Sequence, residues 1–187
     1  MKSQVRIIGG KWRGSKLAVV DARGLRPTPD RIRETLFNWL ALKCEGAQVL
    51  DCFAGSGVLG FEALSRGATH VVALERQKDA VARLKAEAGR FQSHDIEVIA
   101  GDACRSIEGL QREFDIVFID PPYAEPQLRK QVFGKLESRR CLRPGAIIYF
   151  EWPRGSDFEL PSTDLHWLKQ KNAGQVNYAI AEWRLSG

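Results

Sequence analysis

The sequence predicts an α/β protein with a Rossmann-like, mostly parallel sheet covered by helices on both faces. From Gln48 onward, short apolar runs alternate with helix-like segments, and glycine-marked turns separate them. The first apolar run leads into a G-x-G-x-x-G spacing over residues 55–60, which is typical of a strand–turn–helix unit that binds a ligand at the helix start. After Pro153 the alternation stops, and two extended runs predict an antiparallel hairpin that closes one sheet edge.

The N-terminal segment predicts a hairpin followed by one helix. Two β-prone runs, residues 5–8 and 17–20, flank a basic, glycine-rich tip. In the next segment Thr28 is suited to the N-cap, Pro29 to the first helical position and Asp30 to the first turn. Apolar residues then recur at helical spacing over about three turns, at Ile32, Leu36, Trp39 and Leu40.

The remaining elements follow from apolar runs and the segments between them. Five strands are expected, over residues 49–50, 71–74, 97–100, 114–119 and 146–150. Four helices are expected between them, over residues 57–65, 77–91, 103–110 and 127–137. The closing hairpin is expected to pair residues 165–171 with 176–185. A length of 187 residues fits one domain, with a hairpin and helix over residues 1–45 and an α/β core over residues 46–187.

Composition excludes several classes of protein. Hydrophobic residues make up 44% of the chain and charged residues 27%, which is typical of a globular protein and not of a disordered or fibrous one. The four cysteines form no C-x-x-C pair and the three histidines do not cluster near them, so we expect reduced cysteines in the core and no metal site. No apolar stretch approaches the ~18 residues of a membrane helix. We therefore expect a cytoplasmic protein without a membrane partner.

Positive charge is concentrated at the N-terminus. The net charge is +5, but residues 1–33 carry +7, so the rest of the chain carries −2. A basic segment on a near-neutral body is typical of an arm that binds a polyanion, because phosphate contacts come from Lys and Arg. The alternative is a solvated surface hairpin. Trp12, between two basic residues, either stacks on a base or packs against the body of the protein.

An acidic residue directly follows each of four predicted strands, at Asp51, Glu75, Asp102 and Asp120. Ligands of open α/β sheets bind outside the carboxyl ends of the strands, so we expect the four acids to converge on one crevice and not to serve merely as helix caps. Asp51 beside the glycine turn would repel a pyrophosphate. S-adenosylmethionine, with its sulfonium, ammonium, ribose and adenine amine groups, suits the acids better. Glu75 lies where an acid binds ribose hydroxyls, and Asp102, followed by Ala103, would face the adenine.

The tetrapeptide Asp120-Pro121-Pro122-Tyr123 follows the strand over residues 114–119. Two prolines end the hydrogen-bond ladder and fix the backbone, so the Asp120 carboxylate and nearby carbonyls point in fixed directions. Such acceptors bind the N–H groups of a flat amine, and Tyr123 stacks on its ring. A stiff turn without a catalytic role is the alternative.

Taken together, these residues resemble the class I S-adenosylmethionine-dependent methyltransferases, and among them the amino-methyltransferases with a D-P-P-Y motif. The runs over residues 6–14, 26–38, 51–60 and 62–68 are more specifically similar to the RsmD family, whose members methylate the exocyclic N2 of a guanine in bacterial small-subunit (16S) ribosomal RNA. The resemblance covers most of the chain and weakens after about Pro153. The turn over residues 19–24 departs from it by lacking a proline.

The resemblance implies a seven-stranded sheet with an antiparallel C-terminal hairpin, and a site distributed over three sets of residues. The catalytic set is Asp120, Pro121, Pro122 and Tyr123. The cofactor set is Asp51, Phe53, Gly55, Gly57, Glu75, Asp102 and Ala103. The RNA-binding set is Arg6, Lys11, Trp12, Arg13, Lys16 and Arg26. The segment over residues 26–38 would close over the cofactor, with contacts from Thr28 or Arg31 left open. We expect a monomer that acts on ribosomal RNA in a small-subunit particle.

Other functions remain compatible with the sequence. The same fold and a similar tetrapeptide serve methylation of adenine N6 in DNA or of a protein glutamine, although the chain is short for an enzyme that must flip a base from duplex DNA. An RNA-binding protein without catalysis and a nicotinamide dehydrogenase are more distant alternatives. The modified nucleotide, the choice between free RNA and an assembled subunit, and the oligomeric state are not specified by the sequence.

Overall fold

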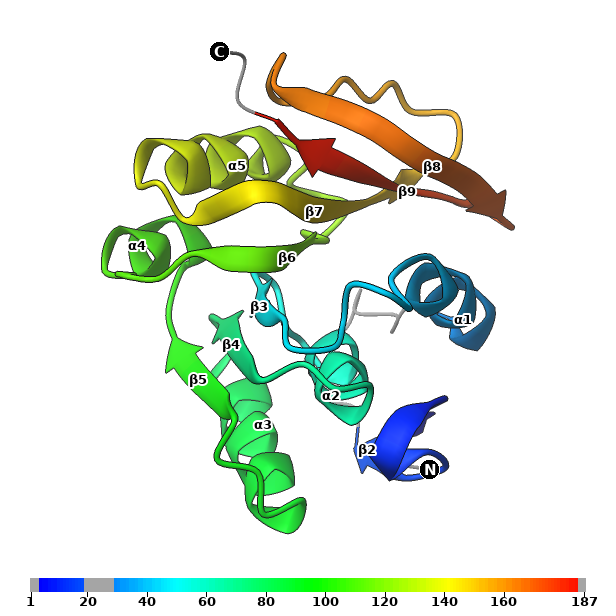
Figure 1. Ribbon diagram of the computed structural model, residues 1–187, viewed down its shortest axis with the longest axis vertical. Helices are drawn as coiled ribbons and strands as arrows, with labels where there is room; N and C mark the ends of the chain where they lie inside the picture. The colour runs from blue at the N-terminus through cyan, green and yellow to red at the C-terminus, as the bar shows by residue number, and fades with distance from the viewer. Residues whose placement is uncertain (1–3, 19–28, 185–187) are drawn as a thin grey trace.

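A seven-stranded sheet forms the centre of the computed structural model, which describes residues 4–18 and 29–184 (Figure 1). Its strands are β3 (Gln48–Asp51), β4 (His70–Glu75), β5 (Ile96–Ala100), β6 (Phe114–Ile119), β7 (Leu142–Pro153), β8 (Leu165–Ala173) and β9 (Val176–Trp183). They lie in the order β5-β4-β3-β6-β7-β9-β8. The first five pair in parallel, and β9 pairs antiparallel with both β7 and β8. The predicted Rossmann-like fold with an antiparallel C-terminal hairpin is confirmed.

Apolar side chains on alternate positions of the central strands face opposite sides of the sheet, as strand geometry requires. Val49, Val71 and Ile116 belong to one core cluster, whereas their chain neighbours Leu50 and Val72 belong to the other. A parallel sheet covered on both faces needs such continuous apolar runs. The short, uninterrupted runs in the sequence are therefore explained by burial of both faces.

Helices fill the two faces unequally. The first core cluster includes residues of α1 (Asp30–Trp39), α2 (Val58–Ser65) and α3 (Lys78–Arg90). The second includes residues of α4 (Ala103–Glu108) and α5 (Leu128–Ser138). The N-terminal hairpin of β1 (Gln4–Arg6) and β2 (Lys16–Ala18), with the 3-10 turn η1 (Gly10–Trp12) at its tip, adds a layer near α2 (Figure 1). No helix within the described ranges is long and apolar enough to cross a membrane.

Most helix and strand boundaries lie within two residues of those expected, and two differences have an identifiable cause. Strand β7 begins four residues before residue 146, because an irregularity between Phe114 and Ile116 lets β6 pair with Leu142 and again with Ile147. It ends three residues after residue 150, because its pairing with β9 continues to Pro153. Helix α1 begins at Asp30, with Pro29 at the N-cap and no capping side-chain bond from it. The expected cap, Thr28, lies outside the described residues, as do residues 19–27.

Candidate functional site: a cavity at the carboxyl ends of the strands

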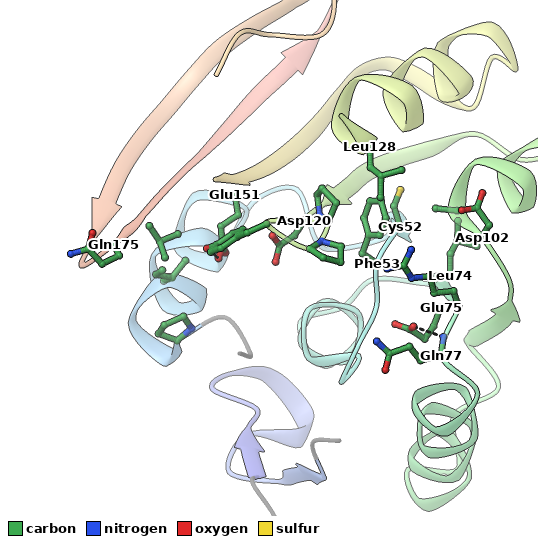
Figure 2. Close-up of a pocket in the computed structure, with 18 of the residues that line it drawn as sticks. Cys52, Phe53, Leu74, Glu75, Gln77, Asp102, Asp120, Leu128, Glu151 and Gln175 are labelled. Atoms are coloured by element: carbon green, nitrogen blue, oxygen red, sulfur yellow. Dashed lines mark hydrogen bonds between the residues drawn. The ribbon is translucent and has the colours of Figure 1, made fainter. Parts of the chain in front are cut away.

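A cavity of about 580 Å³ opens at the carboxyl ends of the parallel strands (Figure 2). The predicted site residues that line it are Phe53, Glu75, Asp102, Ala103, Asp120, Pro121, Pro122 and Tyr123. Because the sheet order is β5-β4-β3-β6-β7, Asp102, Glu75 and Asp120 follow one another along its edge. In Figure 2, Asp120 lies between Glu151 on one side and Glu75 and Asp102 on the other. The predicted convergence holds for these three acids.

Glu75 holds the glycine turn in place. Its Oε2 accepts a hydrogen bond from the Gly55 amide at 2.8 Å and its Oε1 accepts one from the Gln77 amide at 2.7 Å. The side chain is 8% exposed and lines the cavity. A carboxylate has about four acceptor positions, so this role is compatible with accepting ligand hydroxyls as well. Glu75 thus couples the turn after β3 to the turn after β4.

Asp51 does not line the cavity, contrary to the expected convergence of four acids. It is 3% exposed, and its Oδ1 accepts a hydrogen bond from the Phe53 amide at 3.4 Å. Burial, followed by repulsion from Glu75, raises the pKa of Asp51 to about 7, although the amide bond to Phe53 opposes this. Asp51 lies beneath the turn because it is still paired within β3, opposite Ala73 and Phe118.

Gly55 and Gly57 allow the backbone conformation of the turn, and neither lines the cavity. Gly55 has φ +52° and Gly57 has φ +75°, conformations that favour glycine. A Cβ on Gly57 would also come within 2.3 Å of Leu84 on α3 and 3.1 Å of Phe61. Gly57 is therefore required for helix packing, a role that the spacing alone does not reveal.

Asp102 is a helix cap as well as a cavity residue. Its Oδ1 accepts a hydrogen bond from the Arg105 amide at 3.1 Å at the start of α4. Asp102 is therefore a cap, but not merely a cap, because it also lines the cavity. Its neighbour Ala103 is 6% exposed and gives the cavity a small apolar wall.

At the other end of the cavity, the tetrapeptide contacts a fifth acid, which is not among the site residues predicted from the sequence. Glu151 on β7 lines the cavity and is 4% exposed. Its Oε1 accepts a hydrogen bond from the Tyr123 hydroxyl at 3.1 Å, and its Oε2 accepts one from the Tyr149 hydroxyl at 2.8 Å. Glu151 also follows an apolar run, residues 146–150. The rule that found the other four acids therefore finds this one.

Burial and neighbouring negative charges raise the pKa values of Asp120 and Tyr123. Burial, and then the charges of Glu151 and Asp51, hold the pKa of Asp120 well above its usual range. Arg129 opposes this effect, and its Nε donates to the Glu151 carbonyl at 3.1 Å. Burial, then the charges of Glu151 and Asp120, likewise raise the pKa of Tyr123. Asp120 and Glu151 thus form an acidic end that a hydrogen-bond donor would stabilise.

Segments distant in the chain complete the cavity wall beside Glu151. Pro29, Arg31 and Ile32 come from the start of α1, and residues 173–176 come from the tip of the β8–β9 hairpin. Of the two residues named as possible cofactor contacts in this segment, Arg31 lines the cavity and Thr28 lies outside the described residues. The hairpin tip carries no local sign of its approach, because its place depends on how β9 enters the sheet.

The basic N-terminal arm is only partly free for an external partner. The Trp12 ring packs against Phe91 with centroids 4.5 Å apart and against Phe61 at 6.3 Å, so the packing alternative describes this residue. Three other predicted RNA contacts, Lys11, Arg13 and Lys16, are exposed. Arg6 is also exposed and pairs with Asp30 at 3.4 Å. Arg26 lies outside the described residues.

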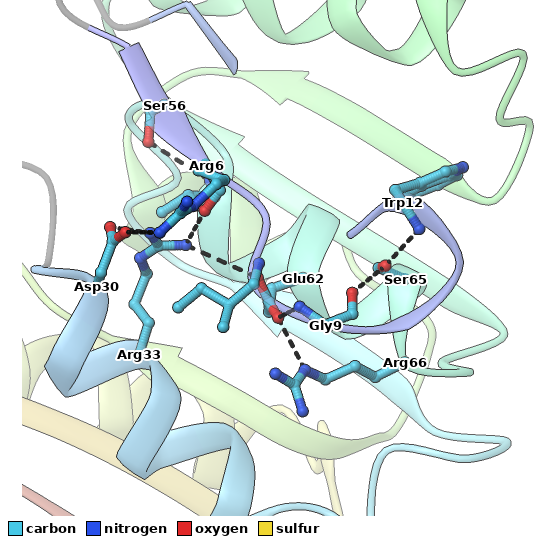
Figure 3. A network of polar contacts seen from close by, with 11 residues as sticks. Arg6, Gly9, Trp12, Asp30, Arg33, Ser56, Glu62, Ser65 and Arg66 are labelled. Atoms are coloured by element: carbon cyan, nitrogen blue, oxygen red, sulfur yellow. Dashed lines mark hydrogen bonds and ion pairs between the residues drawn. The ribbon is translucent and has the colours of Figure 1, made fainter. Parts of the chain in front are cut away.

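A buried network fastens this arm to the core (Figure 3). Glu62 on α2, 0% exposed, accepts hydrogen bonds from the Ile8 amide at 2.7 Å and the Gly9 amide at 2.8 Å. Arg66 pairs with its Oε1 at 2.8 Å, and Arg33 lies 3.7 Å from its Oε2. Arg33 is itself 0% exposed and donates to the Arg6 carbonyl at 2.8 Å. Arg33 therefore belongs to the structure of the arm and not to its phosphate-binding charge.

The remaining reactive side chains form no further centre. Within residues 4–18 and 29–184, no group of three or more His, Cys, Asp or Glu side chains is placed to hold a metal ion. The cysteines Cys44, Cys52 and Cys141 are buried, and Cys104 is partly buried. Burial raises the pKa of the Cys44 thiol to about 11, which keeps it protonated at neutral pH.

Comparisons with known proteins agree with this geometry. The family model described as conserved hypothetical protein 95 matches residues 5–182. Two proteins named ribosomal RNA small subunit methyltransferase D are similar over almost their whole length. The Escherichia coli K12 protein is 41% identical over 98% of this chain and 92% of its own. The Haemophilus influenzae protein is 42% identical over 96% of this chain and 94% of its own.

Solved structures show the same fold. A structure from Escherichia coli, described as a methyltransferase, superimposes with a TM-score of 0.89 at 39% identity, over 97% of this chain and 99% of that chain. A Haemophilus influenzae structure, described as a methylase, does so with a TM-score of 0.83 at 37% identity, over 98% of this chain and 100% of that chain. With the family model and the relatives above, these matches establish that the chain belongs to the RsmD family of methyltransferases.

Proposed function

We propose that this protein transfers a methyl group from S-adenosylmethionine to the exocyclic N2 amine of a guanine in small-subunit (16S) ribosomal RNA. The observation that carries the proposal is the Asp120–Tyr123 tetrapeptide, which lies at a strand end and lines a cavity together with Glu75 and Asp102. The names of the relatives, ribosomal RNA small subunit methyltransferase D, support ribosomal RNA as the substrate.

The residues at the β4 and β5 end of the cavity fit the cofactor. Glu75 and Asp102 offer acceptors for ribose hydroxyls and an amine, and Phe53 and Ala103 supply apolar walls. Asp51 and the two glycines would contribute indirectly, because they do not line the cavity but shape the turn that carries Phe53. When bound, S-adenosylmethionine supplies a methyl group on a sulfonium cation.

At the Asp120 end of the cavity, the tetrapeptide would bind the target amine and make it a better nucleophile. An exocyclic amine is a poor nucleophile because its lone pair is delocalised into the ring. The Asp120 carboxylate and the Pro121 carbonyl would accept its two N–H bonds, which favours the pyramidal geometry that frees the lone pair. The N–C bond forms as the C–S bond breaks, its electron pair stays on sulfur, and the amine then releases one proton to solvent. Tyr123 would hold the ring of the base.

The exposed basic residues of the N-terminal arm are proposed to bind RNA phosphates. Lys11, Arg13 and Lys16 are exposed on a hairpin that is fastened to α2, and Arg31 lies at the cavity itself. Phosphate contacts of this kind set position without reading sequence. The arm would therefore orient the RNA while the cavity selects the base.

A labelled-methyl transfer assay tests the proposal. Wild-type protein is incubated with small-subunit particles, deproteinised 16S ribosomal RNA and DNA, each from cells that lack the enzyme, and the nucleosides are then separated. We expect label in N2-methylguanosine from ribosomal RNA, in particles more than in free RNA. Label confined to N6-methyladenine in DNA, or to glutamine of a particle protein, would overturn the substrate assignment.

A further inference from the structure

An ion pair joins two turns at the rim of the cavity. Arg76 directly follows strand β4, and Glu125 lies in the segment between the tetrapeptide and helix α5. The Arg76 Nη2 donates to Glu125 Oε1 at 2.5 Å, and its Nη1 donates to Oε2 at 3.3 Å. The two residues are 49 positions apart in the chain, so their contact depends on the fold and not on local sequence.

The strand order makes this pair cross the turn that follows β3. Strands β4 and β6 both pair with β3 and lie on its two sides. Neighbouring strands are about 4.8 Å apart, so the ends of β4 and β6 are separated by roughly 10 Å. The turn that carries Phe53 lies between them, and Figure 2 shows Phe53 between Leu128 and Glu75. The side chains of Arg76 and Glu125 therefore reach across this turn.

Only one member of the pair lines the cavity. Arg76 is a lining residue, whereas Glu125 is not. Tyr123 and Leu128, on either side of Glu125 in the chain, also line the cavity. The Arg76 side chain is 51% exposed and the Glu125 side chain 32%. The pair therefore lies where the cavity meets solvent, at the end proposed to bind the cofactor.

The charges at this rim favour the closed pair. The hydrogen bond to Glu125 raises the pKa of Arg76, although burial opposes the shift, and the charges of Glu75 and Asp102 act in the same direction as that hydrogen bond. The hydrogen bond from Arg76 in turn lowers the pKa of Glu125, so both side chains are charged at neutral pH. An ion pair as exposed as this one contributes little to folding. Its position at the rim points instead to a role at the cavity.

We propose that the Arg76–Glu125 ion pair is a gate over the cofactor end of the cavity, which opens for S-adenosylmethionine to enter and for S-adenosylhomocysteine to leave. The inference rests on the cofactor proposed above and adds the element that controls its exchange. Because Glu125 does not line the cavity, breaking the pair there changes the barrier to exchange and not the contacts of the bound ligand. Such a gate slows entry and exit by the same factor and leaves affinity unchanged, since only a difference in contacts shifts a binding equilibrium.

The test measures both rate constants for S-adenosylhomocysteine, which carries no net charge and is therefore little affected by the acids of the cavity. Glu125→Ala breaks the pair without removing a lining side chain, and Arg76→Ala and the double variant complete a double-mutant cycle. Glu108→Ala is the matched control, because it removes another exposed ion pair, with Lys135, and neither of these residues lines the cavity. Labelled ligand, mixed rapidly with protein and then chased with unlabelled ligand, gives the association and dissociation rate constants.

We expect Glu125→Ala to raise both rate constants by the same factor, about 2- to 5-fold, which corresponds to the strength of an exposed ion pair. The Kd should stay within about twofold of wild type. In the Arg76→Ala background the same substitution should have no further effect, and Glu108→Ala should change neither rate constant. Unchanged rates in Glu125→Ala, a rise in dissociation alone, or additive effects of the two substitutions would overturn the gate and leave the cofactor assignment intact. A wild type that binds neither S-adenosylmethionine nor S-adenosylhomocysteine would overturn the proposed function as well.

Salt provides a second measurement that needs no variant to fold. Screening weakens exposed ion pairs, so raising the ionic strength from about 0.05 M to about 0.5 M should raise both wild-type rate constants. The rate constants of Glu125→Ala should respond less, and thermal unfolding shows that the proteins compared are folded. Wild-type rate constants that do not rise with salt, or the same salt dependence in wild type and Glu125→Ala, would contradict the gate.

Discussion

Two buried groups of charged residues in this protein differ in how their charges are balanced. Glu62 contacts two arginines and two backbone amides. Its negative charge is therefore balanced by nearby positive charges and hydrogen-bond donors. Around Asp120, burial and the charges of Glu151 and Asp51 hold the pKa of this partly buried acid well above its usual range, and Arg129 opposes the effect only in part. The first group fastens an arm, and the second faces a cavity.

The difference indicates which buried charges serve the fold and which serve a ligand. A buried acid with matched partners contributes to a specific structure, whereas an acid without enough positive charge costs folding free energy until a ligand supplies donors. The Asp120 end of the cavity is of the second kind. Substitutions should therefore lower stability around Glu62 and lower activity around Asp120, and the following predictions test that separation.

The largest effect on stability is expected for Glu62→Gln. The change removes the buried negative charge that lies 2.8 Å from Arg66 and 3.7 Å from Arg33, and it leaves a single acceptor oxygen for the Ile8 and Gly9 amides. Breaking a buried pair in this way costs about 3–5 kcal/mol of unfolding free energy. Denaturant unfolding measures it. Glu108→Gln, which removes an exposed pair with Lys135, is the control and should leave the midpoint unchanged. Equal effects of the two variants would contradict the role assigned to Glu62.

A change in unfolding free energy of similar size, but one that depends on pH, is expected from Asp51. Its pKa is raised from 3.8 to about 7 by burial, so the protonated form is favoured in the folded state. The stabilisation is therefore complete below about pH 4 and is lost as pH rises towards 7, by an amount on the order of 4 kcal/mol. Asp51→Asn should flatten this dependence and should be more stable than wild type at pH 8. Parallel curves of unfolding free energy against pH for the two proteins would refute the assignment.

Asp120→Ala tests the catalytic side of the comparison. Removing the acceptor for the amine should lower turnover about 100- to 1000-fold, the range found when one transition-state acceptor or donor is lost. S-adenosylmethionine affinity should stay within a few-fold, and the unfolding free energy should stay constant or rise, because an acid whose pKa is raised in the folded protein is gone. Single-turnover methylation, cofactor titration and denaturant unfolding measure the three quantities. Wild-type turnover, or a loss of stability like that of Glu62→Gln, would break the comparison.

The sequence predicted the sheet and most of the cavity because both depend on local pattern. Apolar runs specify the parallel strands, and an acid at the end of each run falls at one edge of the sheet by geometry alone. Glu151 obeys the same rule, because it directly follows the apolar run over residues 146–150. Boundaries such as the start of β7 depend on pairing with Phe114 and have no local sign.

The contacts that the sequence could not predict are those between distant segments. The burial of Arg33 depends on Glu62, which lies on another helix, and the packing of Trp12 depends on Phe61 and Phe91. A charge count over residues 1–33 includes Arg33 without indicating whether its side chain is exposed, as most basic residues are, or buried. Only the fold distinguishes a buried basic residue, whose charge is paired with an acid in the core, from an exposed one that can bind a phosphate.

The smallest effect concerns the tip of the arm, where two glycines form a matched pair. Both have positive φ, +73° at Gly10 and +85° at Gly14, but a Cβ on Gly10 would lie 1.7 Å from the Ser65 carbonyl oxygen, whereas one on Gly14 meets nothing within 4 Å. Gly14→Ala should cost about 1 kcal/mol from backbone strain alone. Gly10→Ala should cost more, because the tip must also move away from α2, to which Ser65 binds it through the Trp12 amide and the Gly9 carbonyl. If the arm orients the RNA, Gly10→Ala should also raise KM for particles while leaving S-adenosylmethionine affinity unchanged. Equal unfolding free energies for the two variants would show that contact with α2 does not hold the arm.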